Sequence, residues 1–276
     1  MEKIVLKIGT GVLATDSPMA PFENIEKIID ATVPHLDSEK QQLVIVSSGA
    51  VGIGKKILKI NKAETLTQKQ VCASLGQAHL IETYQKALAK YDYTAAQILI
   101  TSRDLKAAST RQNLISCLEA MESSPIVPIV NENDVLSTEE IETSTEENSF
   151  GDNDQLSSLL SVRIRADLLV ILTTNTGVFL KKPKSEDERP MTFISDLSEF
   201  NEVEVWQNSK QGRGGIHSKL NSIKYAAKNG LSSWTCSGHD FPALFDFFRD
   251  LSAKTAPLTG TFVFGKDSQW KTNSSK

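Results

Sequence analysis

Short, mainly apolar runs of residues recur along the chain, and segments with helical periodicity separate them. The apolar runs occupy residues 4–8, 43–46, 95–100, 126–130, 168–172 and 233–235. Strands that are buried on both faces have this continuous apolar character, as in a parallel sheet that is covered by helices. Each run is therefore predicted to be a strand of such a sheet, and residues 259–264 are predicted to be a last strand at the edge of the sheet.

Five segments between these runs have the pattern of helices. They are residues 25–35, 69–90, 111–122, 155–165 and 218–229, and in the second of them Leu80, Tyr84 and Leu88 recur on one face. An alternation of strands and helices favours an α/β fold, in which right-handed crossovers place helices on both faces of the sheet. The sequence therefore predicts a three-layer α/β/α sandwich with a mainly parallel central sheet.

The composition is that of an ordinary globular protein and argues against several functional classes. Of the 276 residues, 39% are hydrophobic and 23% are charged, and the net charge is −4. No basic stripe stands out, so nucleic acid is not an expected partner. The N-terminus lacks the apolar core of a secretory signal, and no run approaches the roughly 18 apolar residues of a membrane span, so no membrane association is expected. Cys72, Cys117 and Cys236 form no CxxC pair, which favours reduced thiols in a cytoplasmic protein and no metal site.

Two glycine-rich turns that carry lysines are candidates for phosphate contacts. Lys7 ends the first predicted strand and is followed by Gly9 and Gly11, and ligands of open α/β sheets bind at the carboxyl ends of the strands. Glycines let backbone N–H groups approach phosphate oxygens, and an ammonium group supplies charge. Lys219 follows a second such turn and lies in the first turn of a predicted helix, where its charge opposes the helix dipole unless an anion binds. Taken singly, each lysine is more typical of a solvated surface position than of a phosphate contact.

Polar segments also follow two other predicted strands and precede one helix. Ser48 and Gly49 begin a glycine-rich turn that suits a carboxylate or phosphate, although close packing of strand on helix explains it equally well. NEND at residues 131–134 ends another strand, and GDND at residues 151–154 precedes a helix, where Asn and Asp are also common caps. The charged stretches 137–150 and 181–190 are predicted to be surface loops, either solvated or closing over a ligand.

In their order along the chain, these motifs resemble those of the amino-acid kinase family. The matching segments are KIGTGVL (7–13), VIVSSGAVGIG (44–54), ASLGQAHL (73–80), QILITSRD (97–104), PIVNENDVL (128–136), GDNDQLSSL (151–159) and GRGGIHSKL (212–220). The resemblance extends from Lys7 to about Phe264. NEND, GDND and SLGQ favour the branch that phosphorylates glutamate over the acetylglutamate, carbamate, aspartate and uridylate branches.

This resemblance implies a reaction and its participants. The expected reaction is the ATP-dependent phosphorylation of the side-chain carboxylate of L-glutamate to γ-glutamyl phosphate, the first step of proline biosynthesis, with Mg²⁺ as a cofactor. Feedback inhibition by proline and a homo-oligomer (dimer or tetramer) are also implied. Residues 1–270 are expected to form one kinase domain, with an acceptor-binding N-terminal part and a nucleotide-binding C-terminal part. Residues 271–276 are expected to be a frayed tail, and the C-terminal PUA domain of many relatives is not expected.

The resemblance also implies roles for individual residues. Lys7 and Lys219 are expected to contact ATP and the transferring phosphoryl group, while Asp154 orients both lysines. The expected glutamate-binding residues are Ser48, Asp134 and Asn153, with Gly49, Ala50 and Asn131 nearby. The expected ATP-binding residues are Lys7, Thr173, Thr174, Arg213, Gly214, Gly215, Ile216, His217, Ser218 and Lys219.

The chain departs from the family pattern at three places. Thr174 stands where the family usually has Asp, Arg213 stands where Thr is common, and the segment before Gly151 is longer than usual. Three alternatives to the implied function remain: a kinase of the same fold with another acceptor, a non-catalytic amino-acid sensor, and a purely structural oligomer. Turnover of ATP with a panel of acceptors distinguishes the first from the other two.

Overall fold

The central sheet contains eight strands in the part of the chain that the computed structural model describes, which is residues 1–13, 20–63, 65–137, 153–179, 181, 188–202 and 216–272. The strands are β1 (Glu2–Ile8), β2 (Gln41–Ser47), β3 (Thr94–Ile100), β4 (Ile126–Glu132), β5 (Leu168–Thr173), β6 (Phe193–Ile194), β7 (Ser232–Ser237) and β8 (Thr261–Val263). Their spatial order is β3-β4-β2-β1-β5-β7-β8-β6. Neighbouring strands pair in parallel, and β7 with β8 is the antiparallel pair. The predicted mainly parallel sheet is confirmed.

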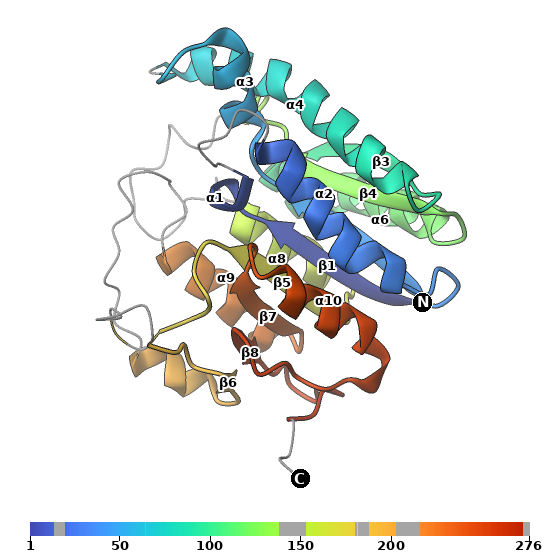
Figure 1. Cartoon of the computed structure of the whole chain (residues 1–276), viewed down its shortest axis with the longest axis vertical. Coiled ribbons are helices and arrows are strands. Elements are labelled where there is room, and N and C mark those ends of the chain that lie inside the picture. Colours follow the sequence, from blue (N-terminus) through green and yellow to red (C-terminus); the bar gives the residue numbers. More distant parts are fainter. Residues whose placement is uncertain are drawn as a thin grey trace.

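Helices cover both faces of this sheet (Figure 1). On one face lie α2 (Ala20–Thr32), α4 (Leu66–Ala89) and α10 (Phe241–Arg249), and on the other lie α6 (Ala108–Met121), α8 (Asn153–Arg163) and α9 (Ile216–Lys228). Ile4, Leu6 and Ile8 of β1 pack in the core of the first face, while Val5 packs in the core of the second. This alternation is the period of two that strands impose on their side chains. The two cores confirm the three-layer α/β/α sandwich.

Three short helices lie near strand ends. They are α1 (Thr10–Leu13) after β1, α3 (Ala50–Leu58) after β2 and α5 (Ser102–Lys106) after β3, and 3-10 turns occupy Val33–His35, Leu197–Glu202 and Leu251–Ala253. Helix α3 lies directly against α4: a β-carbon at Gly76 of α4 would stand 1.8 Å from the carbonyl oxygen of Ala50. Contact this close requires glycine, so Gly76 fixes how near α4 comes to the first turn of α3.

The structure corrects two expectations about the far side of the sheet. Residues 261–263 form β8, but β8 is not the edge strand, because the two-residue strand β6 lies outside it. Helix α10 was not among the predicted helices, although its apolar residues Leu244, Phe247 and Phe248 fill the core. Of the predicted loops and tail, residues 138–150, 182–187 and 273–276 lie outside the described residues.

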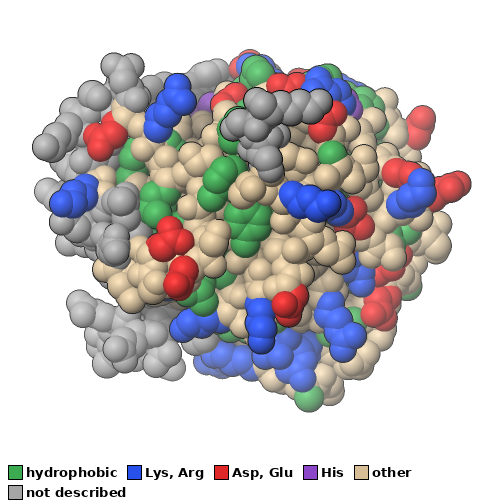
Figure 2. All heavy atoms as spheres, turned by 90° about the horizontal axis from the view of Figure 1, so that it is seen from below, with side chains coloured by type: hydrophobic (Ala, Val, Ile, Leu, Met, Phe, Trp, Pro, Cys, Tyr) green, Lys and Arg blue, Asp and Glu red, His purple; other side chains and the backbone are tan. Residues whose placement is uncertain are grey.

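The surface carries both signs of charge. On the face seen in Figure 2, Lys and Arg side chains are interspersed with Asp and Glu, and several basic side chains gather along one border. Within the described residues, no helix combines the length and the apolar character that a membrane crossing requires.

Candidate active site

Lys7 is the one charged side chain in the buried part of β1. Because side chains alternate along a strand, Lys7 points to the same face as Val5, the face covered by α8 and α9. Its side chain is only 3% exposed. A β-carbon at Gly9 would stand 3.3 Å from the Lys7 Nζ atom and 3.3 Å from the Leu172 carbonyl oxygen. The ammonium group therefore lies over a glycine at the carboxyl end of β1, where no side chain separates it from the backbone.

Asp154 receives this ammonium group. It lies in the first turn of α8, its side chain is 0% exposed, and its Oδ1 atom forms an ion pair with Lys7 Nζ. Burial alone raises the pKa of a carboxyl group, but the charges of Lys7 and Lys219 outweigh burial and hold the pKa of Asp154 below its usual value. Asp154 is therefore an ionised carboxylate in the protein interior at neutral pH.

Lys219 approaches the same carboxylate from the other side. It lies in the first turn of α9, and its Nζ atom donates to Asp154 Oδ2 at 2.6 Å. Its side chain is 21% exposed, against 3% for Lys7. The three groups thus form a cation–anion–cation arrangement with a net charge of +1, open to solvent on the Lys219 side. Such an arrangement suits a polyanion, because a phosphate group can approach both ammonium groups without facing an unbalanced carboxylate.

The ends of β2 and β4 meet the start of α8 through side-chain amides. Asn153 Nδ2 donates to Ser48 Oγ at 2.8 Å and to Asn131 Oδ1 at 3.1 Å. Ser48 and Asn131 are buried, and the backbone N–H of Ser48 donates to the Ile8 carbonyl oxygen at 3.1 Å. Gly49 follows with φ of 104°, a left-handed conformation that favours glycine, and the chain then enters α3. Four of the expected glutamate-binding residues are therefore neighbours beside the lysine–aspartate cluster.

On the β5 side, the predicted nucleotide contacts are only partly within the described residues. Thr173 ends β5 and is buried, whereas Thr174 is exposed. A β-carbon at Gly11 would come within 2.8 Å of Thr174 Cγ2, so the segment after β5 lies against α1. Arg213, Gly214 and Gly215 lie outside the described residues, and of Ile216 and His217 only the backbone at the start of α9 is described. Ser218 is partly buried one residue before Lys219.

Two further residues stand in this region. Asp134 follows β4 and is partly buried. Gln77 was not among the predicted site residues and belongs only to the matching segment 73–80. Its Oε1 atom nevertheless accepts a hydrogen bond from Asn131 Nδ2 at 2.8 Å. The available signal was a polar residue at an inward position of α4, which does not by itself say what it faces. The pairing of α4 with the end of β4 had to be known first.

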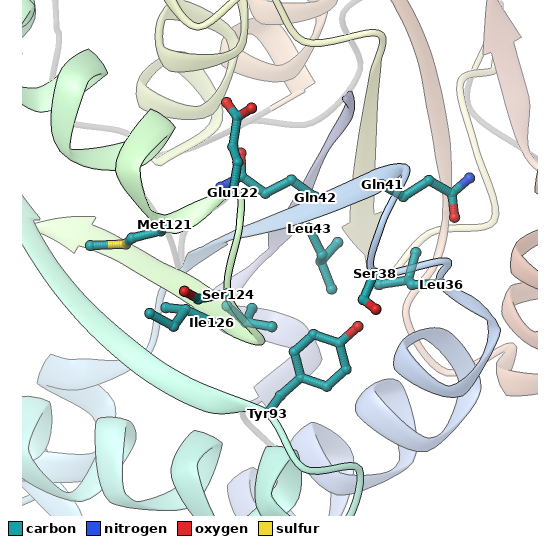
Figure 3. A pocket seen from close by; sticks show the side chains of 11 residues that line it. Leu36, Ser38, Gln41, Gln42, Leu43, Tyr93, Met121, Glu122, Ser124 and Ile126 are labelled. Carbon is teal, nitrogen blue, oxygen red and sulfur yellow. The ribbon is translucent and has the colours of Figure 1, made fainter.

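A small cavity lies at the opposite end of the strands, away from these residues (Figure 3). Its walls include Gln42 and Leu43 near the start of β2, Ile126 at the start of β4, and Tyr93 and Glu122. It has room for about one water molecule at most. Because it lies at the amino ends of the strands, it is separate from the Lys7–Asp154–Lys219 cluster.

Comparisons with known proteins identify relatives of this chain. A family model described as the amino acid kinase family matches residues 2–234. The chain is 32% identical over 248 residues to a glutamate 5-kinase of Clostridium perfringens, covering 89% of this chain and 91% of that protein. It is 34% identical over 251 residues to a glutamate 5-kinase of Clostridium acetobutylicum, covering 88% and 90%, and 32% identical over 273 residues to one of Geobacter sulfurreducens, covering 98% and 71%.

A solved structure supports the fold. The carbamate kinase from Giardia lamblia bound to AMP-PNP aligns with a TM-score of 0.62 at 17% identity, covering 96% of this chain and 99% of that one. At this identity the likeness concerns the arrangement of strands and helices.

Proposed function

The chain belongs to the amino acid kinase family, and from this membership we propose that it transfers the γ-phosphoryl group of ATP to the side-chain carboxylate of L-glutamate. The observation that carries the proposal is the bridging of Lys7 and Lys219 by the buried carboxylate of Asp154. Support for glutamate as acceptor comes from the glutamate 5-kinases to which the chain is 32% and 34% identical.

Phosphoryl transfer to a carboxylate needs charge stabilisation more than proton transfer. A glutamate side chain has a reference pKa of about 4.3 and is already ionised at neutral pH, so the acceptor needs no general base. One carboxylate oxygen attacks the γ-phosphorus, the bond from that phosphorus to the β–γ bridging oxygen breaks, and ADP leaves. The enzyme then has two tasks, which are to hold the two substrates in line and to stabilise charge on the phosphoryl oxygens.

We assign these tasks to the cluster and its surroundings. Lys7 and Lys219 contact the phosphoryl oxygens, and Asp154 keeps the two ammonium groups at a fixed separation, because like charges at close range otherwise repel each other. Ser48, Asn131, Asn153, Gly49 and Asp134 bind the acceptor. Mg²⁺, bound to ATP as part of the nucleotide substrate, would offset part of the negative charge of the triphosphate.

The nucleotide site is proposed on the other side of the cluster, between the end of β5 and the start of α9. Thr173, Thr174 and the backbone that precedes Lys219 line this side. Thr174 contributes a hydroxyl group and no charge, and the two lysines and Mg²⁺ offset the negative charge of the phosphates. Proline, which shares the α-amino-acid group of glutamate, is proposed to inhibit by competing for the acceptor residues.

ADP release with a panel of acceptors tests this function. The purified chain with MgATP and L-glutamate should release ADP, and aspartate, N-acetylglutamate and carbamate should give far lower rates. Added proline should raise the apparent KM for glutamate. Equal turnover with another acceptor would overturn the assignment of glutamate, and absence of turnover with every acceptor would favour an amino-acid sensor.

A further inference from the structure

Two buried amide atoms beside the acceptor residues have no hydrogen-bond partner within the described part of the chain. They are Nε2 of Gln77, a hydrogen-bond donor, and Oδ1 of Asn153, an acceptor. Gln77 is only 8% exposed. Buried polar atoms are nearly always paired, and an unpaired one is destabilising, so each exception calls for an explanation. A ligand that supplies the missing partners is one such explanation.

Backbone groups fix which end of each amide is unpaired. Asn131 Oδ1 accepts from the backbone N–H of Glu132 at 2.8 Å, so the Nδ2 end of Asn131 must face Gln77. Because Nδ2 is a donor, Gln77 presents Oε1 to it and directs Nε2 elsewhere. A flip of the Gln77 amide would set two donors against each other. The backbone hydrogen bond from Glu132 to Asn131 therefore determines that Nε2 is the unpaired end of Gln77.

The same reasoning applies to Asn153 at the other end. Its Nδ2 atom lies 3.3 Å from the Ser47 carbonyl oxygen, 2.8 Å from Ser48 Oγ and 3.1 Å from Asn131 Oδ1. A carbonyl oxygen accepts only, so this end of Asn153 must be the donor and Oδ1 is the end left unpaired. The chain of amides thus runs from an unpaired donor on α4 to an unpaired acceptor at the start of α8.

Gln77 is held close to the glycine-rich turn by its neighbour in sequence. Gly76 brings α4 against Ala50, the first residue of α3, which directly follows Gly49. About two turns further along α4, Tyr84 donates its hydroxyl to Ser47 Oγ at 2.8 Å. One contact before Gln77 and one after it therefore hold α4 against the end of β2 and the turn that follows. Ser48 begins the predicted acceptor site there.

We propose that Gln77 is an acceptor-binding residue whose Nε2 atom donates a hydrogen bond to a carboxylate of the acceptor amino acid. This rests on the proposed function and adds a residue to it. A carboxylate is an acceptor-only group and satisfies a lone N–H donor well, while the ammonium group of the same α-amino acid suits Asn153 Oδ1. A hydrogen bond to a charged partner corresponds to about a 10- to 100-fold change in affinity.

Two substitutions of Gln77 separate ligand binding from structure. In Gln77→Glu one carboxylate oxygen still accepts from Asn131, so the amide chain is retained, but a negative charge replaces the Nε2 donor. We expect the KM for L-glutamate to rise at least about 100-fold, with kcat at saturation within about 3-fold and the KM for ATP unchanged. In Gln77→Met the side chain keeps its length and loses both polar atoms, and the KM for L-glutamate should rise by about 10- to 100-fold.

Gln85→Glu is the matched control, because Gln85 lies on the same helix and its Oε1 atom likewise accepts a hydrogen bond, from the Ala95 backbone N–H at 2.9 Å. Its kinetic constants should equal those of the wild type. A KM for L-glutamate within about 3-fold of wild type in Gln77→Glu would overturn the proposal. So would a fall in melting temperature together with kcat at unchanged KM, which is the result of a purely structural role. Should Gln77→Glu fail to fold, the KM of Gln77→Met decides by the same criterion.

The wild-type acceptor panel keeps this inference distinct from the proposed function. If glutamate fails but another amino-acid carboxylate is phosphorylated, the assignment of glutamate is wrong, and the Gln77 variants are compared with that acceptor. If glutamate is turned over and Gln77→Glu behaves as wild type, only the inference is wrong. If no acceptor is turned over, both are overturned.

Discussion

Lys219 Nζ donates to Asp154 Oδ2 at 2.6 Å, joining two helices on the same face of the sheet. The other oxygen of that carboxylate pairs with Lys7 of β1. Lys7 and Lys219 are 212 residues apart in sequence, and a single buried carboxylate determines their separation. Each ammonium group is paired, yet Lys219 retains some exposure through which an anion can reach it.

Replacement of either lysine by alanine should lower kcat much more than it weakens the binding of the substrates. We expect Lys219→Ala to lower kcat by about 10²–10³, comparable to the loss of one donor to a developing negative charge. Lys7→Ala should do the same, with an additional loss of stability because Lys7 is more deeply buried. Steady-state kinetics with saturating glutamate and ATP provide the measurement.

Lys228→Ala is the control for Lys219, since Lys228 lies on the same helix and is exposed. It should retain wild-type kcat. Near-normal turnover in Lys219→Ala would contradict the role assigned to the cluster.

Replacement of the central carboxylate should affect both stability and catalysis. In Asp154→Asn two ammonium groups lose their shared counter-ion, and loss of one partner from a buried ion pair costs about 3–5 kcal/mol in the free energy of unfolding. The double variant Asp154→Asn/Lys219→Met should be more stable than Asp154→Asn alone, because it removes the repulsion. Urea unfolding checks both, and equal stabilities of the single and double variants would argue against electrostatic coupling.

The difference in unfolding free energy between wild type and Asp154→Asn should depend on pH, because the pKa of Asp154 is lowered in the folded protein. A carboxyl group whose pKa is lower in the folded state than its unfolded value of about 3.9 stabilises the fold fully above that value. The contribution is lost as the pH falls through the folded-state pKa. The difference in unfolding free energy between wild type and Asp154→Asn should therefore be constant from about pH 5 to 8 and shrink below about pH 4. A difference that shrinks between pH 5 and 7 would mean that the pKa is raised instead.

The contact between α3 and α4 predicts opposite effects at two glycines. A β-carbon at Gly76 would clash with the Ala50 carbonyl oxygen, whereas one at Gly52 of α3 would have no atom within 4 Å. Gly76→Ala should therefore lower the free energy of unfolding by about 1–3 kcal/mol, and Gly52→Ala should raise it by up to about 1 kcal/mol through helix propensity. Thermal unfolding of the two variants checks this, and equal melting temperatures would contradict the close helix contact.

Much of the fold follows from local patterns in the sequence. Six mainly apolar runs correspond to β1, β2, β3, β4, β5 and β7, as expected where a strand buried on both faces needs apolar residues on both. Strand β3 departs from this expectation, because it lies at the edge of the sheet and is largely exposed or half-buried. The position of β8 inside β6 was not predictable, since strand order depends on which edges pair and not on the residues of one strand. Strand β6 has two residues, Phe193 and Ile194, too few to form a pattern.

The candidate site was predicted in part. Lys7 stands out locally because it is a charged residue at the end of an apolar strand. Asp154 stands out because it is the last of three consecutive Asn and Asp residues, and a helix cap requires only one. The two residues can pair only because the Lys7 side chain points to the face of the sheet that α8 covers. The resemblance implies this arrangement, and local sequence patterns do not. The local signal of Gln77, a polar residue at an inward position of α4, does not identify what it faces. Its role follows from Gly76, Asn131 and the backbone N–H of Glu132, which the fold brings together.

The most direct test of the proposed reaction measures both of its products in one assay. The chain is incubated with MgATP, L-glutamate and hydroxylamine, which converts an acyl phosphate to a hydroxamate. ADP and γ-glutamyl hydroxamate should form in equal amounts, both should require glutamate, and both should fall by about 10²–10³ in Lys219→Ala. ADP release that does not depend on glutamate, or glutamate-dependent ADP release without hydroxamate, would contradict phosphoryl transfer to the glutamate side chain.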